Sequence, residues 1–258
     1  MNESVGVQNS NKSFREKTRA AFVGVVGTMI GFGAWNDTKD LSINLYEGAL
    51  AHFTHKHEFN HLNQLHIGNY LPYAETIFGT PLMVKDSQQD PAIQFRYYPK
   101  DKYLLILMTK QNRIEGYLVQ SNEIADDFKL TGPFNPQLPF LDKALGEQPF
   151  SSFEFQDNGF QFDSHNLTYF MEKRALGAQG LDLNLYLGVS DYPQSNQNLL
   201  SSIGALDKAV MLDEETETLA TINTLRADFS PNFYGLSKLS DQVVAESLLT
   251  KYEFNTYL

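Results

Sequence analysis

Histidine is concentrated in one short stretch of the sequence. Five of the six histidines lie between positions 52 and 66, namely His52, His55, His57, His61 and His66. Within this stretch, residues 57–61 read HEFNH, which fits the pattern H-E-x-x-H. Residues four positions apart share a face of a helix, so two imidazoles placed in this way can bind one Zn²⁺. The glutamate after the first histidine can then activate a metal-bound water, which is the chemistry of hydrolytic zinc sites.

This array resembles the zincin metallopeptidase motif, and the resemblance implies that His57 and His61 are metal ligands and that Glu58 is the general base. A catalytic zinc needs a third protein ligand. His66 lies five residues after His61, about 140° further round an ideal helix, and Glu75 follows at a spacing shorter than zincins use. Two other interpretations stay open: a non-catalytic metal or pH-sensitive cluster, and solvated surface histidines. We therefore expect no cofactor and keep Zn²⁺ as the alternative.

The composition excludes several other chemistries. There are no cysteines, so thiolate nucleophiles, zinc–thiolate sites and disulfides are ruled out. The formal net charge is −11, and a body of this sign repels nucleic-acid phosphate, so we expect no nucleic-acid partner. At 258 residues, of which 42% are hydrophobic, the chain is able to bury a sizeable core.

The N-terminal residues predict a tail and a membrane anchor. Residues 1–19 are polar, with four basic and two acidic side chains, and we expect a flexible basic tail. Residues 20–36 carry no charge and are long enough to cross a bilayer as a helix. Basic residues precede this segment and Trp35 lies near its end, so the positive-inside rule predicts a single-pass membrane protein with its body outside the cytoplasm. A cleaved signal peptide and a buried soluble helix are the alternatives.

The rest of the chain shows helical and strand-like patterns in turn. Apolar side chains at four-residue spacing predict helices over residues 41–53, 59–67 and 70–78, and helical patterns return over residues 199–212, 217–227 and 239–252. Strand-like runs fall into two groups, residues 82–85, 93–98, 103–109 and 114–120, then residues 153–156, 160–163, 167–173 and 181–188. A proline-rich connection over residues 131–149 separates the two groups.

These elements predict an α+β fold, with an N-terminal membrane helix followed by helices packed on antiparallel meander sheets. We expect four parts along the chain. They are a flexible basic tail (1–19), a transmembrane anchor (20–36), a helical stalk with an ααβββ module (37–130), and a second β-rich region with C-terminal helices (131–258).

The stretch from Leu62 to Gln120 resembles the small ααβββ module of the BamE/OmlA and β-lactamase-inhibitor type. The similarity lies in the segments YLPYAETIFGTP, QFRYYPKDKYLLILM and RIEGYLV. The wider chain is similar to an uncharacterised bacterial membrane-anchored family of unknown function, through FGTPLMVK, YFMEKRALGAQGLDLNLYLGV and RADFSPNFYGL. The first resemblance implies a protein-binding platform. The second implies attachment to a bacterial membrane, so we expect the anchor to lie in the bacterial inner membrane. Neither supplies a catalytic residue.

Aromatic side chains on the predicted strands offer a candidate binding face. Tyr97, Tyr98 and Tyr103 are its members, and core packing is the alternative use of these rings. We therefore predict a membrane-anchored protein-binding or assembly component of the bacterial envelope, without catalysis. Its expected partners are the membrane, through residues 20–36, and an unknown protein, and a homo-oligomer stays open. The alternative function is a membrane-tethered zinc metallopeptidase.

Overall fold

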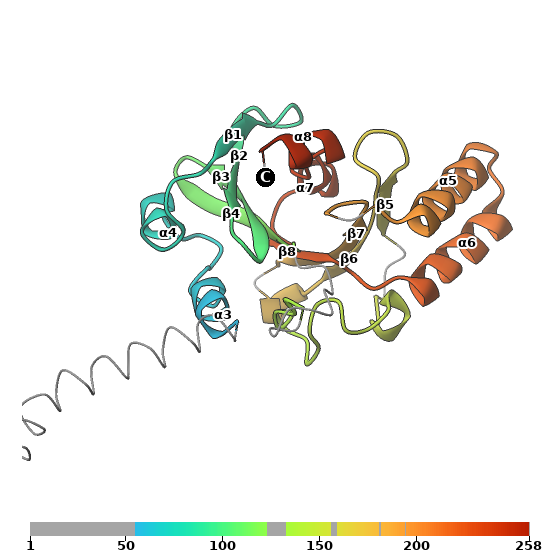
Figure 1. Cartoon of the computed structure of the whole chain (residues 1–258), viewed down its shortest axis with the longest axis horizontal. Helices are drawn as coiled ribbons and strands as arrows, with labels where there is room; N and C mark the ends of the chain where they lie inside the picture. Colours follow the sequence, from blue (N-terminus) through green and yellow to red (C-terminus); the bar gives the residue numbers. More distant parts are fainter. Residues whose placement is uncertain (1–54, 123–132, 156–158, 181, 194, 258) are drawn as a thin grey trace, which may run out of the picture. The chain divides into compact units, whose positions relative to one another are not determined.

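An antiparallel sheet of eight strands forms the centre of the computed structural model, which describes residues 55–122, 133–155, 159–180, 182–193 and 195–257. The strand order is β1-β2-β3-β4-β8-β7-β6-β5 (Figure 1). The strands are β1 (Met83–Asp86), β2 (Ile93–Pro99), β3 (Tyr103–Lys110), β4 (Arg113–Ser121), β5 (Phe160–Asp163), β6 (Tyr169–Ala175), β7 (Asn184–Ser190) and β8 (Phe233–Ser237).

Strand β8 joins two meanders into this one sheet. Strands β1–β4 form the first meander and β5–β7 the second, and β8 pairs with the last strand of each. At the middle of β8, Gly235 lies opposite Leu118 of β4 on one side and Tyr186 of β7 on the other. The expected arrangement of separate meander sheets is therefore wrong, because a strand that the sequence pattern does not predict inserts between them.

Helices cover both faces of the sheet. One apolar cluster lies between the sheet and α3 (Lys56–Leu62), α4 (Leu71–Phe78), α5 (Gln197–Met211), α6 (Glu215–Asp228) and the segment of residues 133–153, which includes the 3₁₀ helix η1 (Phe150–Ser152). The other cluster lies beneath α7 (Asp241–Glu246) and α8 (Lys251–Tyr257). A second 3₁₀ helix, η2 (Gly177–Gly180), precedes β7. The expected helix over residues 239–252 is thus two short helices.

Burial on both faces explains the long apolar runs in the central strands. Successive side chains of a strand point to opposite faces. In β3, Leu105 and Leu107 face the α3–α6 side, whereas Leu104, Ile106 and Met108 face the α7–α8 side. A strand covered in this way is apolar at nearly every position.

The predicted membrane anchor, residues 20–36, lies outside the described residues. Within the part of the chain that the structure describes, no helix combines the length and apolar character needed to cross a bilayer. The predicted fold class is therefore corrected to one antiparallel sheet with helices on both faces. The single-pass, transmembrane assignment has no support from this part of the chain.

Glycines allow β8 to approach its neighbours closely. A Cβ atom added to Gly188 of β7 would lie 2.0 Å from Cζ of Phe233, and one added to Gly235 would lie 2.3 Å from Cδ2 of Leu118. Real Cβ atoms do not come this close to other heavy atoms, so any larger residue would displace buried side chains. The junction between the two meanders therefore depends on residues without a side chain at these positions.

Substitution of Gly188 by alanine tests this dependence. We expect Gly188→Ala to lower the free energy of unfolding by about 1–3 kcal/mol, because the new methyl group overpacks the core against Phe233. A matched control is Gly204→Ala in α5, where an added Cβ meets nothing within 4 Å. That change removes a flexible residue from a helix and should raise the free energy of unfolding by about 0.5–1 kcal/mol. Urea denaturation measures both, and equal effects would contradict the close packing.

Candidate functional site

Helix α3 brings the two motif histidines onto one face. The ring centroids of His57 and His61 lie 4.1 Å apart, as expected for residues four positions apart on a helix. His57 is exposed and His61 is half-buried. The pKa of His61 is lowered, chiefly by partial burial and then by the nearby His57 and Lys100, while Glu58 acts in the opposite direction. The imidazole of His61 is therefore biased toward its neutral form.

Glu58 is held by an ion pair instead of being free beside the histidines. Its Oε1 atom lies 3.1 Å from Nζ of Lys102, in the turn between β2 and β3. Its Oε2 atom is buried and accepts no hydrogen bond from the described residues. Glu75, the nearest downstream glutamate, lies with its Oε1 atom 3.8 Å from Nη1 of Arg96. Both carboxylates thus have cationic neighbours that compete with a metal ion.

The described residues do not complete a metal site. Nowhere in the described ranges do three His, Cys, Asp or Glu side chains converge in a way that could hold a metal ion. His57 and His61 therefore form a pair without a third ligand from this part of the chain. A catalytic zinc requires three protein ligands and an open position for water.

The tyrosines proposed as a binding face lie in the interior. Tyr97, Tyr98 and Tyr103 are each 1% exposed. The hydroxyl of Tyr97 donates to the carbonyl of Ser247, 2.9 Å away, which ties β2 to the segment after α7. Burial raises the pKa of Tyr98 to about 12. In this structure the three rings stabilise the core and present no surface to a partner.

An apolar pocket lies beside α3. It has a volume of about 860 Å³ and opens to solvent. Its floor is formed by Tyr117 of β4 with Tyr234 and Leu236 of β8, which are all buried. Its walls come from the segment after α3, from the connection of residues 137–142 and from the region before β7. Their apolar members are Leu62, Leu65, Ile67, Leu138, Pro139, Leu141 and Leu183.

The rim of the pocket carries polar groups of both signs. Asn63, His66, Gln137, Asp142 and Lys238 line the pocket and are exposed. The described residues offer Lys238 no ion-pair partner, so its charge faces solvent at the mouth. The rim therefore offers donors and acceptors around an apolar interior, which is the usual composition of a binding site.

Two tyrosines at the floor add hydrogen-bonding groups that stay protonated. The rings of Tyr117 and Tyr234 meet edge to face, with centroids 6.3 Å apart. Burial raises the pKa of both hydroxyls above their ordinary value. Neither group ionises near neutral pH, so the floor is uncharged and suits an apolar occupant.

Phe140 stands at the mouth of the pocket in a strained backbone conformation. It lines the pocket, its side chain is 58% exposed, and its φ is +63°. A bulky residue in the left-handed region is a genuine outlier, and such strain costs about 1–3 kcal/mol and clusters at functional sites. The turn is closed by the amide of Leu141, which donates to the carbonyl of Leu138. An exposed aromatic ring in this conformation is not explained by stability alone.

The connection that carries Phe140 is anchored near its start and held by hydrogen bonds within it. Phe134 is buried and stacks on Tyr103, with ring centroids 5.0 Å apart. Within the connection, the amide of Leu138 donates to the carbonyl of Lys143, and the amide of Leu145 donates to that of Pro136. The pocket wall is therefore an ordered part of the fold. From the sequence alone, we interpret this proline-rich segment as a plain connection. Its many apolar residues are the signal that could have indicated a pocket wall.

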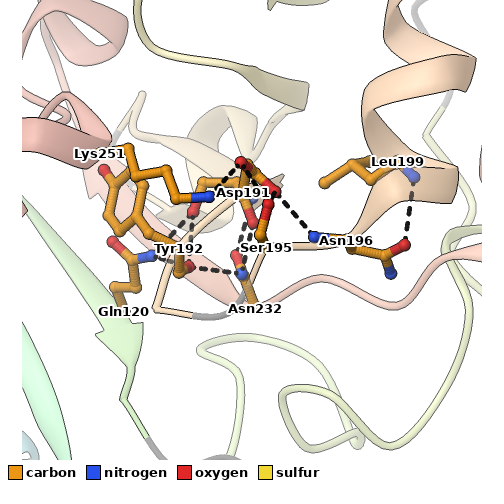
Figure 2. A network of polar contacts seen from close by, with 9 residues as sticks. Gln120, Asp191, Tyr192, Ser195, Asn196, Leu199, Asn232 and Lys251 are labelled. Carbon is orange, nitrogen blue, oxygen red and sulfur yellow. Dashed lines mark hydrogen bonds and ion pairs between the residues drawn. The ribbon is translucent and has the colours of Figure 1, made fainter.

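A separate polar network fixes the segment between β7 and α5 (Figure 2). The buried carboxylate of Asp191 accepts from the hydroxyl of Ser195, the amide of Asn196 and Nζ of Lys251, which lies 2.9 Å away. The carbonyl of Tyr192 accepts from Gln120, Ser190 and Asn232, on β4, on β7 and just before β8. The side chain of Asn196 then caps α5 by accepting from the amides of residues 198 and 199. These groups satisfy one another except for Oε1 of Gln120, which is buried and accepts no hydrogen bond from the described residues. The network ties the segment to β4, β7, α5 and α8.

Comparisons with known proteins add little to this site. No family model matches the sequence, and no curated protein matches it. The structure is similar to the crystal structure of a cysteine-rich secretory protein from Staphylococcus aureus, with 10% sequence identity and a TM-score of 0.33. The match covers 71% of this chain and 47% of that protein, so the chain spans about half the length of this neighbour. A likeness this weak carries no argument about function.

Metal analysis tests the interpretation of the histidines. We expect the purified protein to hold far less than one zinc ion per chain, because two imidazoles alone do not make a stable tetrahedral site. Inductively coupled plasma mass spectrometry of the protein and of His57→Ala measures this directly. Zinc near one ion per chain, lost in the His57→Ala variant, would contradict the expectation and restore the peptidase hypothesis.

Proposed function

We propose that this domain is a polypeptide-binding module whose pocket receives apolar side chains of a partner protein. The observation that carries the proposal is the open, apolar pocket of about 860 Å³ between α3, the connection of residues 137–142 and strands β4 and β8. Its volume lies within the range of about 300–1,000 Å³ that ligand sites occupy. Water in such a pocket faces apolar walls, and its release on binding supplies the driving force.

The rim favours a polypeptide as the occupant. A fatty acid or similar lipid needs one cationic group and otherwise apolar surroundings. Here the rim holds two amide side chains, Asn63 and Gln137, together with one acid and one base, Asp142 and Lys238. Amides pair well with backbone N–H and C=O groups, because each supplies both a donor and an acceptor. A peptide that places apolar side chains in the pocket can satisfy its backbone at this rim.

The proposal assigns binding and no reaction. The acid of the motif, Glu58, is paired with Lys102, and neither of these residues lines the pocket. His66 is the histidine at the rim, and its exposed imidazole is able to donate or accept a hydrogen bond. The proposal keeps the predicted protein-binding role and places its site at the pocket instead of at the buried tyrosines.

Two substitutions at the pocket test this function. Ile67→Trp fills the cavity from a half-buried wall position, and Phe140→Ala removes the exposed ring at the mouth. The assay measures saturable binding of the dye anilinonaphthalene sulfonate and its displacement by peptides selected from a random library. We expect each variant to weaken peptide binding by about 1–2 kcal/mol, or roughly 5- to 30-fold in Kd.

The matched control is Tyr73→Ala, because Tyr73 is an aromatic residue of similar exposure, 49%, on α4 and outside the pocket. It should bind as the unsubstituted protein does. Urea denaturation checks that all three variants are folded. If the dye shows no saturable binding, or if Ile67→Trp binds as well as Tyr73→Ala, the pocket is not the site and the proposal fails.

A further inference from the structure

The hairpin of α5 and α6 ends in an exposed apolar tip that its own fold does not use. The tip consists of Val210, Met211, Leu212 and Leu219, which are 43%, 78%, 55% and 49% exposed. These four are among only eleven large hydrophobic residues that are exposed in the described part of the chain. Val210, Met211 and Leu212 are consecutive in the chain. Neighbouring exposed apolar residues mark a contact site, whereas single exposed ones need no explanation.

The base of the hairpin, and not the tip, attaches it to the domain. Asn196 caps the start of α5. At the end of α6, Arg226 donates to the carbonyl of Phe153 and pairs with the buried Glu172 on β6, and the carbonyl of Phe229 accepts from the amide of Phe150. In Figure 1 the connection between the two helices lies at the end of the hairpin that points away from the sheet. The tip is therefore held firmly and projects into solvent.

Backbone hydrogen bonds close the turn without help from the apolar side chains. The amides of Leu212, Asp213 and Glu214 donate to the carbonyls of Lys208, Val210 and Ala209. Polar residues at positions 211 and 212 would leave these bonds in place and would suit an exposed turn better. Closure of the turn therefore does not depend on the two most exposed apolar side chains.

A group of acids lies within the tip and defines the chemistry of its partner. Asp213, Glu214, Glu215 and Glu217 lie between Leu212 and Leu219 in the sequence and are all exposed. None of the four has an ion-pair partner in the described ranges. Acids in the first turn of α6 favour the helix dipole, but Asp213 and Glu214 precede that turn. Lys208, in the last turn of α5, is an exposed base close to them in sequence, so the four acids outnumber it and the surface combines exposed apolar side chains with net negative charge.

From this combination we infer that the tip is a second docking site, for a basic protein segment that presents apolar side chains between lysines or arginines. Opposite charges on the two surfaces would steer association and reject other partners. An anionic membrane is disfavoured because its surface repels the acids. A second copy of this chain is disfavoured because the net charge of each copy is −11. This inference is independent of the proposed pocket, since none of the tip residues lines it.

Three synthetic helical peptides test the inference on the full chain. The first combines leucines on one face with lysines elsewhere, the second replaces its lysines by glutamates, and the third replaces its leucines by serines. Fluorescence anisotropy measures their binding. We expect the leucine–lysine peptide to bind and both others to bind at least about tenfold more weakly, because attachment needs the apolar contact and the charge together.

Variants with matched controls locate the binding. Met211→Ser with Leu212→Ser should weaken binding about tenfold or more, and so should Glu214→Lys with Glu215→Lys. Tyr252→Ser is the apolar control, because Tyr252 on α8 has the same 78% exposure as Met211. Glu147→Lys with Glu154→Lys is the charge control, at two exposed acids distant from the tip in sequence. Both controls should leave binding unchanged.

Nuclear magnetic resonance of ¹³C-methyl methionine reports the site directly. Addition of the leucine–lysine peptide should shift the Met211 methyl signal and leave the signals of the buried Met108 and Met171 unchanged. Equal binding by the tip variants and the unsubstituted protein would overturn the inference. So would tip-dependent binding to vesicles of phosphatidylcholine and phosphatidylglycerol, or tip-dependent self-association in sedimentation. Those two outcomes would assign the tip to a membrane or to a second copy.

Discussion

The pairing of β8 with both meanders is the constraint on which the rest of the structure depends. This strand of five residues has β4 on one side and β7 on the other, so it converts two smaller sheets into one of eight strands. The pairing is close because Gly188 and Gly235 leave room for Phe233 and Leu118. Side chains of β8 then enter both apolar clusters, with Phe233 on one face and Tyr234 and Leu236 on the other. Loss of this strand would divide the core.

The proposed function follows from the same strand. Tyr234 and Leu236 form the pocket floor together with Tyr117 of β4, so the floor exists only where β4 and β8 lie side by side. The walls are supplied by segments that approach this junction from α3 and from the proline-rich connection. Helices α7 and α8 cover the opposite face and leave the pocket side to these irregular segments. A rigid sheet thus positions a site whose rim is made of loops, which is the common arrangement in binding proteins.

Sequence patterns predict the first meander well and miss the strand that matters most. Strands β2, β3 and β4 begin and end within one residue of their expected positions, because their long apolar runs lie between clear turns. Strand β8 escapes prediction for physical reasons. It has five residues, all of them buried, so it lacks the alternation that marks a half-exposed strand, and Pro231 and Gly235 weaken the signal further. Its partners are also distant in sequence.

The candidate sites show the same limit of sequence patterns, which reveal local contacts but not contacts between distant parts of the chain. Helical spacing correctly predicts that His57 and His61 meet, since that contact is local. It says nothing of a third ligand or of Lys102, which reaches Glu58 from another element. The pocket is less visible still, because its lining comes from five separate stretches of the chain that only the fold brings together. From the sequence, the three tyrosines Tyr97, Tyr98 and Tyr103 are expected at the surface, but they are buried. In sequence, an aromatic strand covered on both faces looks the same as one that presents aromatic rings to a partner.

Hydrogen exchange of the β8 amides tests the account most directly. If β8 is the centre of one continuous sheet, the amides of Phe233–Ser237 exchange only on global unfolding and are among the slowest in the protein. The edge strands β1 and β5 should exchange much faster, through local opening. Exchange of β8 at the rate of these edges would show that the two meanders open independently, and it would contradict both the single sheet and the pocket built upon it.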